Sequence, residues 1–164
     1  MLSDYHVRPS NDADREWIPA FTREHWGAEY VVAHGVIYVP HRLPGFVAEN
    51  QSGAVVGLAT YAPERPSCEL VTLNAVPEGT GIGSALLRAV VAAATTAGCT
   101  RLWLVTSNHN LNGLAFYQKR GLHIIAVHTD ALARARRIKP SIPLVGANGI
   151  LLRDEIELQM LLVP

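Results

Sequence analysis

The chain has 164 residues, which suits one domain with a sizeable buried core. Its residues are 49% hydrophobic and 17% charged, and its formal net charge is zero, a balance that excludes a disordered chain. Zero net charge also argues against a nucleic-acid binder that works by bulk attraction to phosphates, and no apolar stretch approaches the roughly 20 residues that a membrane span needs.

The N-terminal part predicts a short strand followed by helical structure. The segment YHVRP has the character of a strand, and residues 12–26 predict a helix that Asp12 or Asp14 caps. Pro19 lies inside that helix and is expected to split or kink it. Residues 28–44 mix β-branched side chains with glycine and proline, and we interpret them as a second helix followed by an irregular arm.

The middle of the chain gives a sharper signal. Three strands are predicted at residues 44–50, 55–62 and 68–73, joined by the short turns QSGA and ERPS, and short loops indicate antiparallel neighbours. A glycine-rich loop follows, and then an alanine- and leucine-rich helix that ends near Gly98.

The C-terminal third alternates strands with other elements. In order, we expect a buried strand at 101–107, a capped helix at 108–121, a strand at 122–129, a basic segment at 131–140, a loop at 141–154 and a last strand at 154–163. The whole chain, residues 1–164, therefore reads as a single α/β (α+β) domain with helices on a partly antiparallel sheet.

The glycine loop PEGTGIGSAL raises the question of an anion site. A dinucleotide fingerprint requires G-x-G-x-x-G, and here the third glycine is displaced; a P-loop requires a lysine that the loop lacks. The loop still leads into a helix whose first N–H groups have no partner within the helix, and glycine lets a phosphate approach the backbone closely. A tight structural turn is the alternative.

Two segments together resemble the GNAT superfamily of N-acetyltransferases. Glu78-Gly79-Thr80-Gly81-Ile82-Gly83 is similar to that family's Gln/Arg-x-x-Gly-x-Gly/Ala loop, with Glu78 in place of Gln or Arg and expected to turn outward. NLNGLAFYQKRGL is similar to the family's N-x-x-A-x-x-x-Y-x-x-x-G-F/L segment, with Gly113 at the alanine position. The tail from residue 134 to 164 also resembles one subgroup of the family.

The resemblance implies a fold and a cofactor. The expected fold is a GNAT-like mixed, mostly antiparallel sheet of six to seven strands, flanked by helices and splayed between its fourth and fifth strands. The cofactor is acetyl-CoA, used as a co-substrate. Its pantetheine arm would pair with the backbone of Val71, Thr72 and Leu73, and its diphosphate would lie on Gly79, Thr80, Gly81, Ile82, Gly83 and Ser84.

The resemblance also implies roles for two residues of the capped helix. Asn110 would bind the pantetheine, and Tyr117 would contact the cofactor and protonate the departing CoA thiolate, since a phenol with a pKa near 10 is a donor at neutral pH. Each has a plainer interpretation: Tyr117 as a packed side chain with its hydroxyl at the surface, and Asn110, or instead Asn108, as a helix cap.

The general base and the acceptor are less sharply indicated. Glu69 lies four residues before Leu73, and by strand period it shares a face with it; the alternative is an exposed strand carboxylate. Asp154 and Glu155 are rival bases. In this family the first helices and last strands usually shape the acceptor pocket, and here they offer Trp26, Tyr30, Tyr38, Arg153, Asp154 and Glu155.

The charges near that pocket favour opposite acceptors. The acidic side chains suit a cationic amine, whereas the basic run of Arg134, Arg136, Arg137 and Lys139 suits an acidic substrate unless it is a solvated helix face. The alternative function is a module of the same fold that binds or senses acyl-CoA without turnover.

The remaining expectations concern setting and partners. Cys68 and Cys99 have no metal or redox spacing and are expected in the core, which fits a cytoplasmic protein. The histidines have no ligand spacing, so no metal is expected. The acceptor would be a small-molecule or peptide amine, with no nucleic-acid or membrane partner. A homodimer is expected if the apolar last strand lies at a sheet edge.

Overall fold

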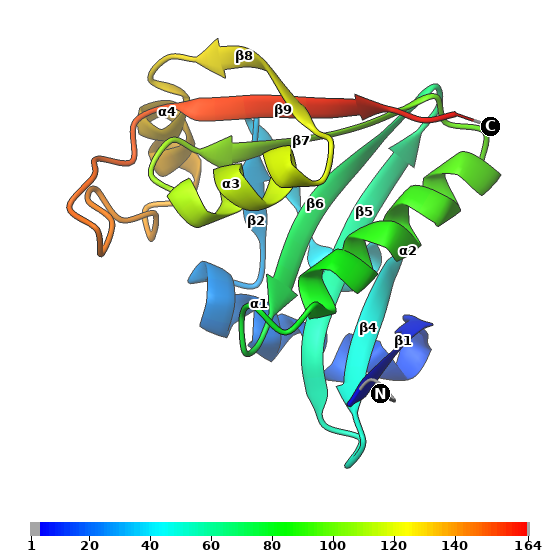
Figure 1. The fold of residues 1–164 in the computed structure, drawn as a ribbon. Coiled ribbons are helices and arrows are strands. Elements are labelled where there is room, and N and C mark those ends of the chain that lie inside the picture. Colours follow the sequence, from blue (N-terminus) through cyan, green and yellow to red (C-terminus); the bar gives the residue numbers. More distant parts are fainter. Residues whose placement is uncertain (1–3, 164) are drawn as a thin grey trace. The chain divides into compact units, whose positions relative to one another are not determined.

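The computed structural model describes residues 4–163 and divides into two compact units. The first unit contains residues 4–19, 40–102 and 161–163, and the second contains residues 20–39 and 103–160. Figure 1 shows the secondary structure along the chain.

The first unit is built on four strands that neighbour one another in the order β1-β4-β5-β6. They are β1 (Tyr5–Pro9), β4 (Gly45–Asn50), β5 (Val55–Glu64) and β6 (Ser67–Ala75), and each neighbouring pair is antiparallel. The three successive antiparallel strands predicted from the short turns are therefore confirmed.

Helix α2 (Ile82–Thr96) packs across these strands, as Figure 1 shows. The contact is close at Gly57 on β5, where an added Cβ would meet the side chains of Ile82 and Leu86. Both of those side chains are buried, as expected for the apolar face of a helix on a sheet. The helix stops as predicted, with Gly98 just beyond its end in the left-handed region at φ +83°.

The predicted helix over residues 12–26 is in fact two helices. A 3₁₀ helix, η1 (Asp12–Glu16), precedes α1 (Ile18–Trp26), with Pro19 in the first turn of α1, where its missing N–H costs nothing. The predicted cap was wrong: Asn11 caps η1 by accepting from the Ala13 N–H at 2.9 Å, and Asp14 completes a capping box by accepting from the Asn11 N–H.

The prediction of a second helix within residues 28–44 was also wrong. Strands β2 (Val31–Ala33) and β3 (Val36–Tyr38) form a hairpin in the second unit, and a short 3₁₀ helix, η2 (Pro40–Arg42), follows in the first. The two linking residues, His34 and Gly35, have φ values of +42° and +80°, which suits the mirror-image turns of two-residue hairpins. The histidine disguised the turn, because Asn or Asp is the usual residue there.

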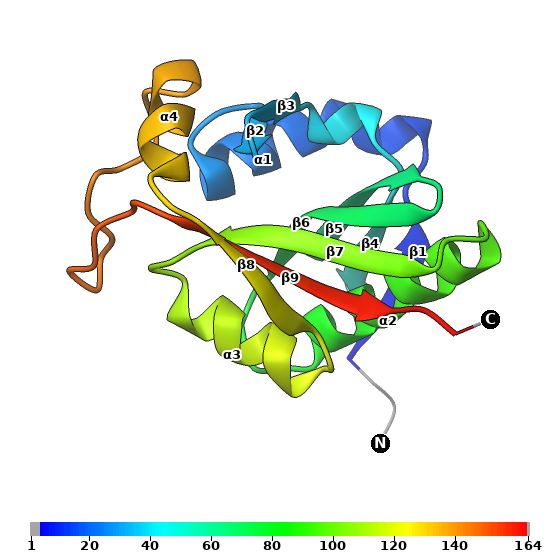
Figure 2. The same cartoon turned by 90° about the horizontal axis from the view of Figure 1, so that it is seen from above.

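The second unit also contains three strands in the order β7-β9-β8 and two helices. These are β7 (Arg101–Ser107, whose first two residues belong to the first unit), α3 (Leu111–Lys119), β8 (His123–His128), α4 (Ala131–Ile138) and β9 (Glu155–Leu161). Figure 2 shows β9 beside β8, to which it pairs antiparallel.

The expectation of a dimer depended on the last strand lying at a sheet edge, and the strand order does not place it there. The last strand, β9, has a neighbour on each side, and it is β8 that lies at the end of the strand order. Ile124, Ile125 and Val127 on β8 are exposed.

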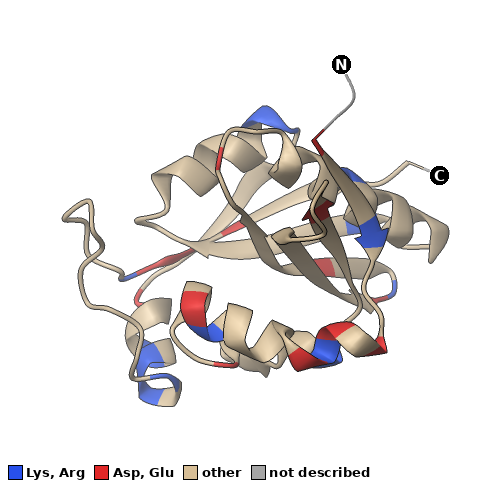
Figure 3. Cartoon of the chain, turned by 90° about the horizontal axis from the view of Figure 1, so that it is seen from below, with Lys and Arg blue, Asp and Glu red and all other residues tan. Residues whose placement is uncertain are grey.

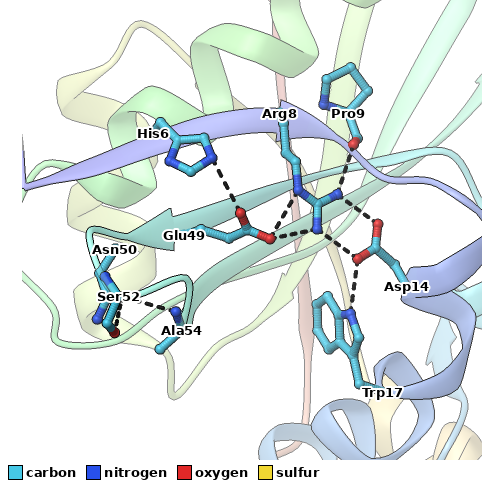
Figure 4. A network of polar contacts seen from close by, with 9 residues as sticks. All are labelled: His6, Arg8, Pro9, Asp14, Trp17, Glu49, Asn50, Ser52 and Ala54. Carbon is cyan, nitrogen blue, oxygen red and sulfur yellow. Dashed lines mark hydrogen bonds and ion pairs between the residues drawn. The ribbon is translucent and has the colours of Figure 1, made fainter.

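A polar network ties β1 to β4 and η1 within the first unit (Figure 4). The Arg8 guanidinium donates to both oxygens of Asp14, at 2.8 and 2.9 Å, and to Oε1 of Glu49 at 2.6 and 3.0 Å. The Trp17 indole N–H also donates to Asp14, at 2.9 Å, and His6 contacts the second Glu49 oxygen at 3.2 Å. Every carboxylate oxygen of the network therefore has a partner.

Arg8 also perturbs the acids that it binds. Its hydrogen bonds lower the pKa of Asp14 to about 2, and they lower the pKa of Glu49 below its usual value.

The cysteines are free and buried in the first unit, as expected. Desolvation raises the pKa of the Cys68 thiol to about 12, which makes it an inert core group. Among residues 4–163, no helix combines the length and apolar character needed to cross a membrane.

Candidate functional site

The glycine loop shapes the start of α2 without any capping side chain. Gly81 is the N-cap residue and adopts a left-handed conformation, φ +85° and ψ −5°, that only glycine enters easily. Gly81 has no side chain that could accept from the N–H groups of the first turn, and that turn contains no acidic residue. The N-terminus of α2 therefore presents backbone N–H donors and the positive end of the helix dipole, an arrangement suited to an anion.

The rest of the loop is open. Gly79, also left-handed at φ +78°, has nothing within 4 Å of where a Cβ would stand. The Thr80 hydroxyl donates to the Pro77 carbonyl at 3.0 Å, which holds the loop on the side of β6. Glu78 is exposed, as the expectation that it turns outward requires.

A β-bulge changes the predicted face of Glu69. Leu73 is paired with Ala59 and Thr72 with Thr60, but the next pairs are Leu70 with Tyr61 and Glu69 with Ala62, so Val71 is an extra residue on β6. Paired residues point to the same side of a sheet. Glu69 therefore shares a face with Thr72 and not with Leu73, and the period-two prediction was wrong because the bulge interrupts the period.

Glu69 is also not the exposed carboxylate of the alternative interpretation, since it is only 3% exposed. Thr72, on the same face, is buried too, and its hydroxyl lies 2.6 Å from the Thr60 hydroxyl across the strands. Val71 and Leu73 are half-buried. Glu69 therefore lies on the same face of the sheet as the buried Thr72 of β6 and the buried Thr60 of β5.

Asn110 is the cap of α3 in the second unit. Its Oδ1 accepts from the Gly113 N–H at 3.1 Å, and its Nδ2 donates to the Thr106 hydroxyl at 2.9 Å. A Cβ at position 113 would overlap the Asn110 amide group, which explains why glycine stands where the family pattern has alanine. Asn108 has another task, since it holds the backbone of Leu151, Arg153 and Asp154.

Tyr117 lies on α3, half-buried, with the Phe116 ring edge-on at 5.3 Å. Burial raises the pKa of its phenol above the usual range, because the phenolate would lose hydration. The hydroxyl therefore keeps its proton throughout the neutral range, which is what the expected role of proton donor requires.

The residues proposed for the acceptor pocket differ in how far their polar groups are already engaged. Asp154 accepts from the Arg153 side chain at 2.9–3.0 Å and from the Asp130 N–H at 2.9 Å, so its charge is balanced. These bonds lower the pKa of the Asp154 carboxyl, the Arg153 side chain most of all. Glu155 is 3% exposed and has one oxygen bonded, to the His34 N–H at 3.0 Å.

Trp26 and Tyr30 contact the end of α4. The Trp26 carbonyl accepts from Nζ of Lys139 at 2.5 Å, and the Tyr30 hydroxyl donates to the Ile138 carbonyl at 3.3 Å. Lys139 also lies over the Tyr30 ring at 5.7 Å from its centre. These groups join α1 and α4 within the second unit.

The basic run on α4 (blue in Figure 3) is a solvated face only in part, since Arg134 and Arg137 are exposed whereas Arg136 and Lys139 are not. Lys139 is buried, which lowers the pKa of its ammonium group. Arg136 donates to the carbonyls of Ile142, Pro143 and Leu152 and so holds the loop that follows the helix. Arg134 donates to the Thr129 carbonyl at 3.2 Å. Three of the four basic side chains thus bind carbonyl groups of their own chain.

Sequence reasoning missed His34, which binds Glu155, and Trp103, whose ring lies next to that of His34. The His34 ring lies 4.9 Å from the Trp103 ring and 6.0 Å from the Tyr38 ring. His34 and Trp103 come from a hairpin turn and from β7, and no local pattern links them to β9. The one available signal was the His-Gly pair between two β-branched runs, which predicts a hairpin.

The comparison with family models gives one match. Residues 9–122 match the model of the Acetyltransferase (GNAT) family. The matched range includes the glycine loop, β6, Asn110 and Tyr117.

Two curated proteins of Bacillus subtilis (strain 168) are similar to nearly the whole chain. YdhI is 43% identical over 150 residues, covering 92% of this chain and 94% of its own, and YxbD is 37% identical over 151 residues, covering 92% and 95%. Both carry the description of uncharacterized protein.

Solved structures share the fold. The IAA acetyltransferase from Bacillus cereus ATCC 14579 is 25% identical with a TM-score of 0.73, over 96% of this chain and 99% of that one. A Bacillus subtilis acetyltransferase in complex with CoA is 17% identical with a TM-score of 0.67, over 97% and 98%. A GNAT acetyltransferase from Elizabethkingia anophelis with acetyl-CoA bound is 19% identical, also with a TM-score of 0.67, over 97% and 99%.

Proposed function

Because this chain belongs to the acetyltransferase (GNAT) family, we propose that it moves an acetyl group from acetyl-CoA directly to a primary amine. N-acetyl transfer from acetyl-CoA is the chemistry of the family; the primary amine and the residue roles are the proposal. The observation that carries it is the uncapped start of α2, where the glycine loop gives backbone donors for a diphosphate.

In the proposed reaction the neutral amine attacks the thioester carbonyl. The C–N bond forms and the carbonyl oxygen takes negative charge. The C–S bond then breaks to release CoA as a thiolate, and the attacking nitrogen loses a proton to water to give the neutral amide. A backbone N–H near Leu73 polarises the carbonyl, and Tyr117 gives its proton to the thiolate. The Tyr117 phenol is protonated at neutral pH, its pKa being raised by burial, and the phenolate left after the transfer takes a proton back from water.

The amine must first lose a proton, because its ammonium form has no lone pair and a pKa near 10.4. Glu69 stays a proposed base, now on the Thr72 side of β6, where it is buried. The pantetheine arm is proposed to pair with the backbone of Val71, Thr72 and Leu73, and Asn110 is proposed to contact it next to its capping bonds.

Two substitutions at Ser84, in the first turn of α2, test the diphosphate site. Ser84→Glu places a negative charge at the helix start, which favours the helix by about 0.3–1 kcal/mol but repels a diphosphate. Ser84→Gln has a similar size and no charge. By calorimetry, we expect Ser84→Glu to bind acetyl-CoA at least 100-fold more weakly than Ser84→Gln, while its melting temperature is equal or higher. Equal affinity of the two variants for acetyl-CoA would show that the diphosphate does not bind at the N-terminus of α2.

A further inference from the structure

Glu155 has one oxygen that the fold does not use. Its Oε2 accepts from the His34 N–H at 3.0 Å, while its Oε1 is buried and has no hydrogen-bond partner among the described residues. A buried polar atom without a partner costs free energy, and a buried charge costs more. Such an atom needs an explanation, and a ligand that brings a donor is one.

The neighbouring carboxylates on the strand do not share this property. Asp154 is bonded to Arg153 and to the Asp130 N–H, and Glu157 contacts Nε2 of His128 at 3.0 Å. Glu155 lies between them and is the most deeply buried of the three. The unused oxygen is therefore specific to position 155 and does not reflect a generally acidic strand.

Two aromatic rings lie close to the ring of His34, the residue whose backbone binds Glu155. His34, which holds Oε2 through its backbone, has the Trp103 ring 4.9 Å from its own ring, and the Tyr38 hydroxyl lies 3.4 Å from its Nε2. Indole and phenol faces attract cations, and their apolar bodies favour a short alkyl chain. Carboxylate and rings together suit an alkylammonium group.

Three basic groups of the second unit are already bonded within the chain, whereas Arg137 is exposed. Arg136 and Lys139 are bonded to backbone carbonyls, and Arg153 is paired with Asp154. An acceptor with a carboxylate would find these cations already engaged. The two acceptor classes that the sequence left open are therefore not equally supported.

We propose that Oε1 of Glu155 accepts a hydrogen bond from an ammonium group of the acceptor, and that the acceptors of this enzyme are short alkylammonium compounds without a carboxylate. That the bound ammonium compound is the acetyl acceptor rests on the proposed function. The binding site itself lies within the second unit. Trp103 and Tyr38 contact the alkyl chain beside the ammonium group.

Calorimetry with a simple probe tests the site without turnover. The probe is 1,4-diaminobutane, its uncharged counterpart is 1,4-butanediol, and the variants are Glu155→Gln and the matched control Glu157→Gln on the same strand. We expect wild type and Glu157→Gln to bind the diamine alike, and Glu155→Gln to bind it at least about tenfold more weakly, the loss expected for a charge-assisted hydrogen bond. The diol should bind all three proteins equally weakly.

Three results would overturn the inference: unchanged diamine affinity in Glu155→Gln, an equal loss in Glu157→Gln, or wild type that does not prefer the diamine to the diol. If Glu155→Gln does not fold, the carboxyl-carbon NMR signal of Glu155 in the wild-type protein decides. It should shift with the diamine and not with the diol, and equal behaviour counts against the proposal.

The same probe separates this inference from the proposed function. Diamine binding through Glu155 without any acetylated product would contradict the proposed reaction and leave the ammonium site standing. Acetylation of amino acids, with diamines neither bound nor acetylated, would support the proposed reaction and contradict the ammonium site at Glu155.

Discussion

Asp14 in the first unit and Glu155 in the second are both buried carboxylates, and they differ in how completely the fold uses them. Both Asp14 oxygens are bonded, to Arg8, to the Trp17 indole and to a backbone N–H (Figure 4). Glu155 has one bonded oxygen and one buried oxygen without a partner. Burial alone therefore does not distinguish these two carboxylates, whereas their hydrogen-bond partners do.

The difference has an energetic meaning. A buried acid with a matched cation stabilises the folded state, and removing either member leaves the other uncompensated. A buried acid with an unused oxygen destabilises the folded protein slightly, and a chain retains it where a ligand completes the bonding. Substitutions at the two kinds of position should therefore have opposite consequences for stability and function.

The largest expected effect comes from a comparison of two half-buried tyrosines, one in each unit. Burial raises the pKa of both Tyr117 and Tyr61. We expect Tyr117→Phe to lower kcat about 100-fold, the usual contribution of a general acid, with little change in melting temperature. Tyr61→Phe, whose ring stacks on Phe46, should keep kcat within about twofold. The steady-state rate of CoA thiol release gives kcat for both variants. Similar kcat values would show that Tyr117 is not the general acid.

Asp14→Asn should give the next largest effect, on stability and not on turnover. The pKa of Asp14 is lowered from 3.8 to about 2 by its bonds to Arg8, a preference for the ionised form worth about 2 kcal/mol. We expect the variant to lose about that much free energy of unfolding at pH 7, measured by urea denaturation.

The pH dependence of Asp14 has a definite sign. Because the folded pKa lies below the unfolded value, the stabilisation is present above pH 4 and is lost as the pH falls towards 2. The wild-type protein should thus lose its advantage over Asp14→Asn across that window. A stability gap that is unchanged at pH 2 would show that the Asp14 charge is not its source.

Gly113→Ala tests whether the capping bonds of Asn110 in the second unit stabilise the fold, as the bonds of Asp14 do in the first. Helix propensity alone predicts that alanine stabilises α3 by up to about 1 kcal/mol. A Cβ at that position would overlap the Asn110 amide, so we expect instead a loss of about 1 kcal/mol, the usual value of a cap. Thermal unfolding distinguishes the two signs. Stabilisation would mean that the cap tolerates displacement and that Asn110 is not fixed by α3.

Glu155→Gln should have the smallest effect on stability, which completes the contrast with Asp14. The amide keeps an oxygen for the His34 N–H and removes a buried charge. We expect the free energy of unfolding to stay within about 0.5 kcal/mol of wild type or to rise. A loss as large as that of Asp14→Asn would place Glu155 among the structural acids.

The sequence predicted elements whose signals are local. The turns QSGA and ERPS sit between alternating runs, so β4, β5 and β6 were predictable, and the helix after the glycine loop has both a glycine start and a glycine stop. The glycine loop itself was visible for the same reason, since its conformation depends on its own residues.

The failures concern features that no local pattern records. The bulge at Val71 moved Glu69 to the other face of β6, and a histidine took the left-handed position in the β2–β3 turn. The bond that marks Glu155 joins residues 121 positions apart, and the Arg8–Glu49 bond joins residues 41 apart. The sequence could nominate Glu155 as acidic and near the end of the chain, but its unused oxygen depends on the folded arrangement.

One measurement tests the proposed reaction most directly: product analysis by mass spectrometry after incubation with acetyl-CoA and 1,4-diaminobutane. We predict mono-N-acetylated diamine in one-to-one ratio with released CoA, and a rate about 100-fold lower in Tyr117→Phe. Acetyl-CoA that binds but yields no acetylated product with any primary amine would contradict the account.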